Sequence, residues 1–358
     1  MAEWRGVRRM GGAVVEYQQA DEVTVVLPRE PKRRRGRIRS ILVSKRPRGW
    51  FGWTAVVLGW LALLTGLTGV GLHYNTMSSE SAMLAASFAP YLMLFAVLAL
   101  VILLLARAWR GALVALLATA AALWSQLPML WPDGTAGPGV DVAVMQSNLL
   151  FGNADTDAVV RAVRENGIEV LTLEELTPEA LARLDGAGLA ELLPYRHVEA
   201  AAGGAGSGIF TRYPLEAGSK LSGFLLNNVR ANMIHPDRGP VAVFQFHPIP
   251  PNLNFDAWSN ELRTIRDLLD QQPGQVIVGG DFNATFDHAS FRELLRGRYA
   301  DAGELLGIGA MPTWPDDRSW GPLLGLDRVL VAGGHATQVR SLTIPRSDHR
   351  AVVARLRL

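Results

Sequence analysis

The chain has 358 residues, no cysteine and a formal net charge of +2. This length exceeds the usual size of one domain, so we expect at least two structural units. The lack of cysteine excludes disulfide bonds, thiolate metal sites and a cysteine nucleophile. The composition changes near residue 135, where long apolar stretches and a basic run give way to the mixed composition of a globular domain.

Charge is divided unevenly between these two parts. Residues 1–135 contain 15 Lys/Arg and 7 Asp/Glu, a net charge of +8, whereas residues 136–358 contain 20 and 26, a net charge of −6. Proteins that bind the phosphate backbone of nucleic acid normally carry a positive excess. The C-terminal part lacks that excess, so the sequence disfavours nucleic acid as a partner.

Three apolar stretches, residues 51–72, 88–106 and 111–130, follow the basic run. Each is about the 20 residues that a membrane-spanning helix requires, and a soluble helix is seldom apolar on all faces. Tryptophan, which favours the bilayer interface, lies near the ends of these stretches, at Trp50, Trp53, Trp109 and Trp131. We therefore predict three transmembrane helices within residues 50–131.

The charges of the loops predict the orientation of these helices, because Lys and Arg accumulate on the cytoplasmic side. Ten Lys/Arg lie between Arg29 and Arg48, in a tail over residues 1–49 that we expect to be disordered. Residues 73–87 contain no Lys or Arg, and the next turn holds Arg107 and Arg110. Three crossings of the cell membrane then place the N-terminus inside, and the linker at 132–139 leads to a domain outside.

Residues 140–358 alternate strand-like and helix-like segments, which is typical of an α/β domain. Apolar runs predict strands at 140–146, 169–173, 207–210, 229–234, 241–247, 275–278, 326–331 and 351–356. Amphipathic patterns predict helices at 156–166, 178–184, 256–269 and 289–295.

Polar residues that can bind a metal or a phosphate lie at the ends of these strands. They are found in the segments VAVMQSN, VLTLEEL, VAVFQFH, VIVGGDFNAT, LDRVLV and IPRSDHR. Taken singly, each could be an ordinary turn or loop residue. Their repeated position at strand ends indicates one shared site, which contains Asn148, Glu174, Glu175, His247, Asp281, Asn283, Asp327, Asp348 and His349.

Five motifs, QSN, LEE, HP, GGDFN and SDH, occur in an order that resembles the endonuclease/exonuclease/phosphatase superfamily. That superfamily includes DNase I-like nucleases, neutral sphingomyelinases and inositol phosphatases. The resemblance covers residues 140–358. It implies a four-layer α/β/β/α sandwich that hydrolyses phosphate esters with the help of a divalent metal.

The resemblance also implies a metal site. Glu174 stands where the family has Gln, which places the metal-ligand role on Glu175. Asn148 and Asp348 would help Glu175 to hold Mg²⁺ or Mn²⁺, since hard cations prefer oxygen ligands.

The remaining residues would act on the phosphate and on the attacking water. By resemblance, Asp281 orients and deprotonates the water, while Asn283 and His247 bind the phosphoryl oxygens. His349, oriented by Asp327, is then an acid/base or an electrostatic stabiliser at the phosphate.

A three-helix anchor joined to this domain also resembles the VanJ type of teicoplanin-resistance membrane protein, which implies a polyprenyl pyrophosphate substrate and a part in antibiotic resistance. We therefore expect a phosphatase or phosphodiesterase that acts on a membrane lipid phosphate. A nuclease or a sphingomyelinase-like phosphodiesterase is the alternative. A third hypothesis is a catalytically inactive, membrane-tethered binding domain, against which the intact set of polar residues argues.

Other notable residues are interpreted as structural or as contacts with the membrane. GGAGSG at residues 203–208 lacks the ending of a phosphate-binding loop and is expected to be a hairpin loop. Five histidines without a motif are expected to be structural or exposed: His73, His197, His235, His288 and His335. Four apolar residues after His247 are expected at the membrane interface: Ile249, Leu253, Phe255 and Trp258.

The orientation can be tested by labelling, because the chain contains no cysteine of its own. Single cysteines introduced at Thr135 and at Arg39 should differ in their reaction with a membrane-impermeant maleimide in intact cells. We expect Thr135→Cys to be labelled and Arg39→Cys to be protected until the cells are lysed. Labelling of Arg39→Cys alone would place the C-terminal domain in the cytoplasm.

Overall fold

A computed structural model describes residues 7–10, 13–16, 49–76 and 79–358. The chain forms two units, residues 1–46 and 47–358. In the first, β1 (Val7–Met10) and β2 (Ala13–Glu16) form an antiparallel hairpin, within a segment that we expected to be disordered. The basic run before the first apolar stretch lies outside the described residues.

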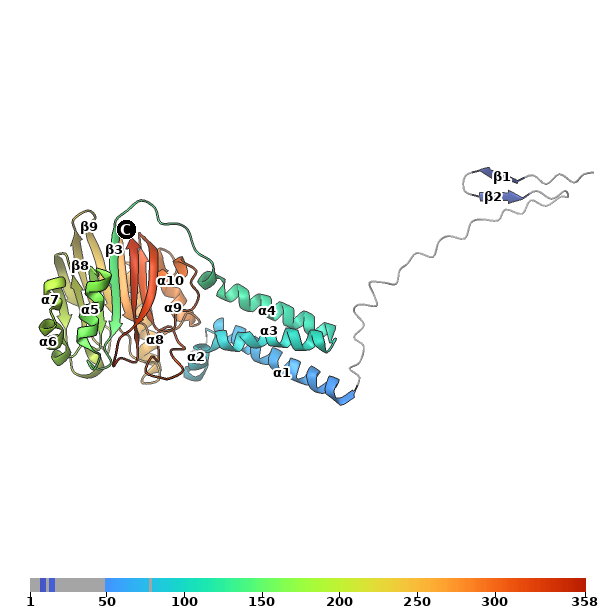
Figure 1. Ribbon diagram of the computed structural model, residues 1–358, viewed down its shortest axis with the longest axis horizontal. Helices are drawn as coiled ribbons and strands as arrows, with labels where there is room; N and C mark the ends of the chain where they lie inside the picture. Colours follow the sequence, from blue (N-terminus) through green and yellow to red (C-terminus); the bar gives the residue numbers. More distant parts are fainter. Residues whose placement is uncertain (1–6, 11–12, 17–48, 77–78) are drawn as a thin grey trace, which may run out of the picture. The chain divides into compact units, whose positions relative to one another are not determined.

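The second unit begins with four helices, α1 (Gly49–His73), α2 (Glu80–Ala86), α3 (Ala89–Leu105) and α4 (Trp109–Leu130) (Figure 1). Helices α1 and α4 are each long and apolar enough to cross a membrane. Helices α2 and α3 meet at a bend of 64° and would add a third span if the pair forms one span. The described residues therefore contain two or three candidate spans where the sequence predicts three.

Small residues allow the helices of this bundle to approach closely. A Cβ atom on Gly66 of α1 would lie 2.5 Å from the backbone nitrogen of Ala96 on α3, and one on Gly69 would lie 2.8 Å from the carbonyl oxygen of Ala89. Such contacts are common between helices in membranes. The outer face of the bundle is apolar, with Leu64 and Leu94 both 64% exposed. A surface of this kind favours a lipid environment over water.

Residues 141–357 contribute the strands of two six-stranded sheets. The first sheet has the order β13-β14-β3-β4-β6-β5, and the second has the order β11-β12-β10-β9-β8-β7. The strands of the first are β3 (Asp141–Asn148), β4 (Val170–Glu174), β5 (Tyr195–Glu199), β6 (Ser207–Thr211), β13 (His335–Thr343) and β14 (Arg350–Arg357). The strands of the second are β7 (Leu215–Lys220), β8 (Val229–His235), β9 (Gly239–Phe246), β10 (Gln275–Asp281), β11 (Tyr299–Asp301) and β12 (Asp327–Ala332).

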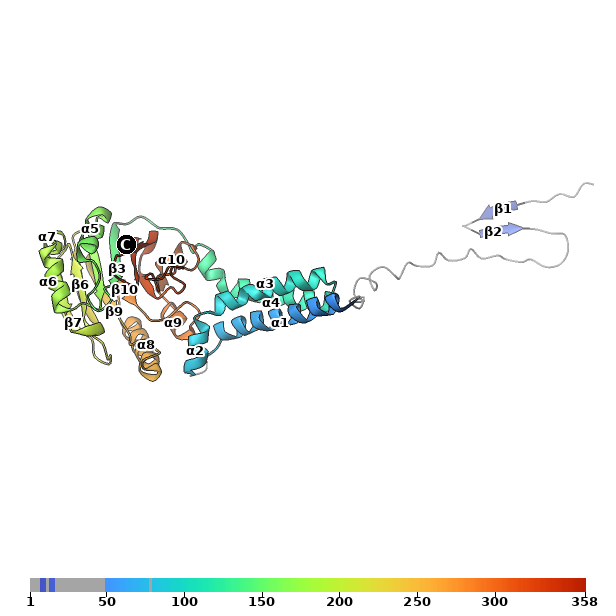
Figure 2. The same ribbon diagram turned by 60° about the horizontal axis from the view of Figure 1, so that its bottom comes forward.

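The two sheets pack face to face around branched apolar side chains such as Val144 of the first sheet and Ile277 of the second. The outer face of the first sheet is covered by α5 (Thr156–Asn166), α6 (Pro178–Gly186) and α7 (Leu189–Leu192). The outer face of the second is covered by α8 (Phe255–Asp270) and α9 (Ala289–Leu294), and α10 (Ala302–Leu305) follows β11 (Figures 1 and 2). The predicted four-layer α/β/β/α sandwich is confirmed.

The topology brings distant strand ends together at one edge of the sandwich. Strands β3 and β4 are parallel, as are β9 and β10, so each pair presents its carboxyl ends side by side. Strands β12 and β14 run antiparallel to β10 and β3, so they begin at the same edge. Asp281 and Asp327 are direct register partners, and so are Asn148 and Glu174.

In the two six-stranded sheets, four strands were not predicted, namely β5, β7, β11 and β13. Strands β7 and β13 lie at sheet edges and are largely exposed, so their sequences lack an apolar run. The hairpin that joins β5 to β6 contains GGAGSG, as the sequence predicts, and includes the short 3₁₀ turn η1 (Gly203–Ala205).

Hydrogen bonds attach the helix bundle to the sandwich. His73 at the end of α1 lies 2.7 Å from the carboxylate of Asp287, and Gln126 of α4 donates to the same oxygen at 2.9 Å. The Tyr91 hydroxyl of α3 donates to the Leu323 carbonyl at 2.6 Å. His73 is therefore structural, as expected, and the helices form a fixed contact with the sandwich in the second unit.

Candidate active site

A pair of buried aspartates and one histidine form the centre of the polar cluster at the sheet edge. His349 Nδ1 lies 2.8 Å from Asp327 Oδ2, and its other ring nitrogen lies 3.7 Å from Asp281 Oδ2. Asp281 is the last residue of β10 and Asp327 the first of β12, so their register pairing fixes both carboxylates. The structure thus brings together three of the predicted catalytic residues.

The electrostatics of this centre are set by burial and by the excess of carboxylates. Burial alone would lower the pKa of His349, but the charges of Asp327 and Asp281 outweigh it and raise that pKa to about 10. Burial also raises the pKa of Asp281, against the attraction of His349. A carboxylate with a raised pKa is a better proton acceptor than an exposed aspartate.

The opposite side of the cluster is formed by Glu175, Asn148 and His247. Asn148 Nδ2 donates to Glu175 Oε1 at 3.3 Å and to Asp281 Oδ2 at 3.2 Å. His247 Nε2 lies 3.9 Å from Asp281 Oδ2 and 4.0 Å from Glu175 Oε1. Both sides of the cluster therefore meet at the same oxygen of Asp281.

Two of the predicted site residues have a left-handed backbone, with φ of 55° at Glu175 and 48° at Asn283. The strained turn at Glu175 brings its carboxylate to the amide of Phe151, which donates to Oε2 at 2.5 Å. Asparagine tolerates this region, and the Asn283 amide donates to the Pro248 carbonyl at 3.1 Å. That bond places Asn283 beside the loop that follows His247.

Glu174 points away from Glu175 and into the space between the sheets, where it is fully buried. It accepts hydrogen bonds from Gln146 at 2.7 Å and from Gln245 at 3.2 Å. Burial, together with the nearby charge of Asp327, raises its pKa well above the usual range. Glu174 therefore lies behind the cluster, joined to Asp327 through Gln146, whereas the Glu175 carboxylate is at its edge beside Asn148.

Asp348 joins the cluster from the loop before β14. Its Oδ1 lies 3.9 Å from His349 Nε2, and its Oδ2 accepts a hydrogen bond of 3.0 Å from the indole of Trp314. Trp314 was not among the residues predicted for the site. It belongs to the loop between α10 and β12, whose Leu323 carbonyl binds Tyr91 of the bundle.

Sequence reasoning also missed Asn228, a fully buried residue just before β8. Its side-chain oxygen accepts from the backbone nitrogen of His247 at 2.6 Å, and its amide donates to the His247 carbonyl at 3.4 Å. Two consecutive asparagines at 227 and 228 are typical of a turn, so the sequence alone does not predict these hydrogen bonds to the His247 backbone.

One group of side chains has the spacing of a metal site. Ligand atoms of Asp281, Asp327 and His349 all lie within 4.8 Å of one another, so this buried cluster could bind a divalent metal. Both oxygens of Asp327 also have hydrogen-bond partners, in His349 and in Gln146 at 2.8 Å. Each carboxylate oxygen has a second lone pair, so a metal could bind there beside these partners.

The predicted metal ligands Glu175, Asn148 and Asp348 carry the oxygen atoms that Mg²⁺ and Mn²⁺ prefer, and Asn148 Nδ2 donates to Glu175 Oε1 at 3.3 Å. Asp348 Oδ1 is buried and has no hydrogen-bond partner among the described residues. A buried polar atom without a partner is costly, and a cation would satisfy it. The donor chemistry of this group therefore fits a hard divalent ion.

The loop after His247 differs from the expectation that it would rest on a membrane. Trp258 is only 2% exposed, because its ring packs against His288 and its indole donates to the Phe282 carbonyl. Ile249 and Phe255 are half-buried beside the same core. Leu253 is the one residue of the four that is exposed, at 71%.

Comparisons with known proteins agree with this fold. The model of the Endonuclease/Exonuclease/phosphatase family matches residues 145–349, which is more than half of the chain. A humanized D. rerio TDP2 gives a TM-score of 0.53 at 15% identity, over 61% of this chain and 99% of that one. A Beutenbergia cavernae endonuclease/exonuclease/phosphatase protein gives a TM-score of 0.50 at 19% identity, over 61% of this chain and 72% of that one. No curated protein sequence matches the chain significantly.

Because Glu174 and Glu175 have different surroundings, we expect their substitution by glutamine to have different effects on activity. Glu175→Gln should lower turnover by more than about a hundredfold, the upper range for residues that only support a metal ligand. Glu174→Gln should lower it far less. The buried Oε1 atom of Gln245 has no partner among the described residues, so that amide can turn to accept from the new one, while Gln146 keeps its bonds to Asp327 and to the Oε1 atom of the new residue.

The measurement is metal-dependent phosphate release by the two purified variants, with thermal unfolding as the control for folding. If the two effects were interchanged, the metal-ligand role would belong to Glu174.

Proposed function

The chain belongs to the Endonuclease/Exonuclease/phosphatase family, and we propose that it is a metal-dependent phosphoesterase acting on a membrane lipid. The bond cleaved would be in the phosphate or pyrophosphate head, with polyprenyl pyrophosphate as the first candidate. Its sandwich would lie outside the cell membrane, held there by the helix bundle.

One observation carries the proposal: the loop that follows Asp281 leads directly to the bundle. Asp281 and Asn283 contribute to the polar cluster, and Asp287, in the same loop, is hydrogen-bonded to His73 and Gln126 at the ends of α1 and α4. These helix ends lie at the boundary of the candidate spans. The cluster is therefore close to the level at which lipid head groups would lie.

Two further features favour a lipid substrate. Confinement at a membrane raises the effective concentration of lipid-borne substrates relative to soluble ones. The net charge of −6 on residues 136–358 opposes the binding of polyanionic nucleic acid.

The bundle also supports the outside placement of the sandwich. Arg107 lies in the turn between α3 and α4, and Arg110 lies in the first turn of α4. His73 and Tyr91, at the other ends of α1 and α3, contact the sandwich. The cationic turn and the sandwich are therefore at opposite ends of the bundle. Under the positive-inside rule the sandwich is then extracytoplasmic.

In the proposed mechanism, Asp281 accepts a proton from the attacking water while Asn148 donates to the same carboxylate and orients it. Asp327 holds His349 through Nδ1, so Nε2 faces Asp281 and the reacting phosphate. His349 then stabilises the developing negative charge by donating a hydrogen bond. His247 and Asn283 bind the phosphoryl oxygens from the opposite side.

Glu175, with Asn148 and Asp348, would hold Mg²⁺ or Mn²⁺. The ion, when bound, supplies positive charge that neutralises the phosphoryl and leaving-group oxygens. Phe151 keeps the Glu175 carboxylate in place through its backbone amide. Trp314 does the same for Asp348 through its indole.

A nuclease is the second candidate, since the D. rerio TDP2 structure complexed with a single strand DNA product has a similar fold, with a TM-score of 0.52 at 15% identity. The two candidates differ in what the active site must accommodate. A single strand needs a cationic groove for successive phosphates, whereas a lipid head needs one site beside a membrane.

The proposal predicts the outcome of a substrate panel with Mg²⁺, covering polyprenyl pyrophosphate, sphingomyelin and single-stranded and plasmid DNA. The purified full chain should hydrolyse the lipid pyrophosphate fastest, measured as phosphate from that substrate, phosphocholine from sphingomyelin and strand cleavage of DNA. Phosphate release is the signal of the lipid pyrophosphate. Asp281→Asn should abolish that release while leaving lipid binding intact, because it removes the proton acceptor and keeps the size of the side chain. Metal-dependent cleavage of DNA at a higher rate than that of any lipid would establish the nuclease instead.

A further inference from the structure

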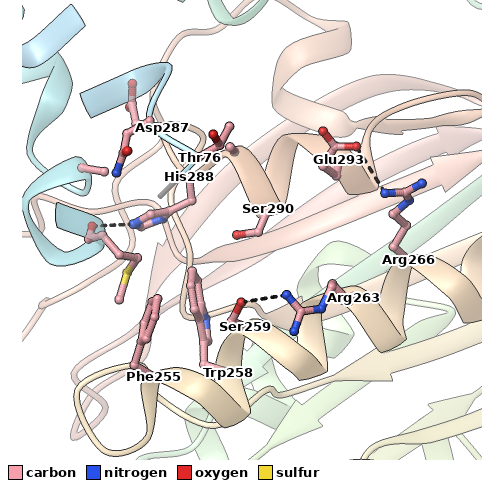
Figure 3. A pocket seen from close by; sticks show the side chains of 14 residues that line it. Thr76, Phe255, Trp258, Ser259, Arg263, Arg266, Asp287, His288, Ser290 and Glu293 are labelled. Carbon is pink, nitrogen blue, oxygen red and sulfur yellow. Dashed lines mark hydrogen bonds and ion pairs between the residues drawn. The ribbon is translucent and has the colours of Figure 1, made fainter. Parts of the chain in front are cut away.

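A cavity of about 290 Å³ lies between the ends of the bundle and helices α8 and α9, apart from the polar cluster (Figure 3). Thr76 just after α1 and Met83 of α2 line it on the bundle side, and Trp258 and Arg263 of α8 line it on the other. None of its lining residues has a role in the mechanism above. We propose that this cavity binds the head group of an anionic phospholipid.

The position of the cavity points to a lipid. Its bundle wall comes from residues 75 and 76, directly after α1, and from Met83 and Ala86 of α2, directly before α3. These segments join the candidate spans on the side of the sandwich, which is where head groups lie if the bundle crosses the membrane. The inference therefore rests on the membrane placement that the proposed function uses.

The lining separates into an apolar and a polar part, as an amphiphile requires. Met83, Phe255 and Trp258 belong to one apolar cluster that continues from α2 into the core beneath α8. Figure 3 shows Ser259 and Arg263 on α8 opposite Ser290 on α9. A phosphate between these helices would meet two hydroxyl groups and a guanidinium group.

The polar part holds two arginines and two carboxylates, and the carboxylate of Asp287 is already bound by His73 and Gln126. Arg263 donates to Ser259 at 3.4 Å and to Asn260, and it forms no ion pair with a carboxylate of the described residues. Arg266, by contrast, lies 3.4 Å from Glu293 and 3.6 Å from Asp270. Arg263 is thus the cation that remains available, and its planar group suits a phosphate.

The size of the cavity limits what can enter. Pockets that enclose a whole drug-sized ligand usually have volumes of roughly 300 to 1,000 Å³. A cavity of about 290 Å³ accepts a phosphate with a small alcohol such as glycerol, while the acyl chains stay in the bilayer. The ligand class is therefore a glycerophospholipid with a small, negatively charged head.

The test is native mass spectrometry of the full chain in detergent, with EDTA present so that no lipid is hydrolysed. Dioleoyl phosphatidylglycerol should bind more tightly than dioleoyl phosphatidylcholine. Arg263→Ala should weaken phosphatidylglycerol binding about tenfold, the loss expected for one charge-assisted hydrogen bond, and leave phosphatidylcholine unchanged. Ser290→Ala should weaken it less.

The matched control is Arg164→Ala, since Arg164 is also an exposed arginine on a helix but lies on α5, which covers the other sheet. Equal effects of Arg263→Ala and Arg164→Ala would overturn the proposal, as would equal binding of the two lipids by the unaltered chain. Displacement of phosphatidylglycerol by millimolar inorganic phosphate would show a site for small anions and would also overturn it. None of these readouts depends on turnover, so a failed substrate panel would leave the binding result intact.

Discussion

The concentration of buried carboxylates at one edge of the sandwich constrains the rest of the site. Asp281, Asp327 and Glu174 are almost completely buried, and uncompensated charges in such a place cost several kcal/mol each. The structure compensates in different ways: burial raises the pKa of Glu174, and Asp327 shares its charge with His349. What is left is Asp348 Oδ1, a buried acceptor with no hydrogen-bond partner among the described residues, which a divalent cation could satisfy.

The helix bundle contacts the loops that carry the polar cluster. The loop from Asp281 to Asp287 has the proposed proton acceptor at one end and a bond to His73 at the other, so the polar cluster and the helix bundle share one short segment. The loop between α10 and β12 repeats this arrangement, since Trp314 binds Asp348 and Leu323 binds Tyr91. Hydrogen bonds therefore fix the position of the polar cluster relative to the helices.

The sequence predicts this fold well wherever burial shapes the pattern. Every predicted strand and helix of residues 140–358 begins within two residues of an observed one, because buried runs and amphipathic helices carry a clear period. Exposed edge strands such as β7 and β13 carry none and were missed. The predicted site residues meet at one sheet edge, although their roles remain predictions. Contacts such as that of Asn228 with the His247 backbone, or the burial of Trp258, depend on tertiary packing that no local pattern encodes.

The central claim is that Glu175, Asn148 and Asp348 bind the metal, while Asp281, Asp327 and His349 act on the water and the phosphate. Crystals of the chain soaked in Mn²⁺ test it directly, because anomalous scattering locates the ion independently of activity. The account predicts a peak in bonding contact with Glu175, with the hydrogen bond between His349 and Asp327 still in place. A peak bonded to Asp327 and His349, with no ion at Glu175, would contradict it.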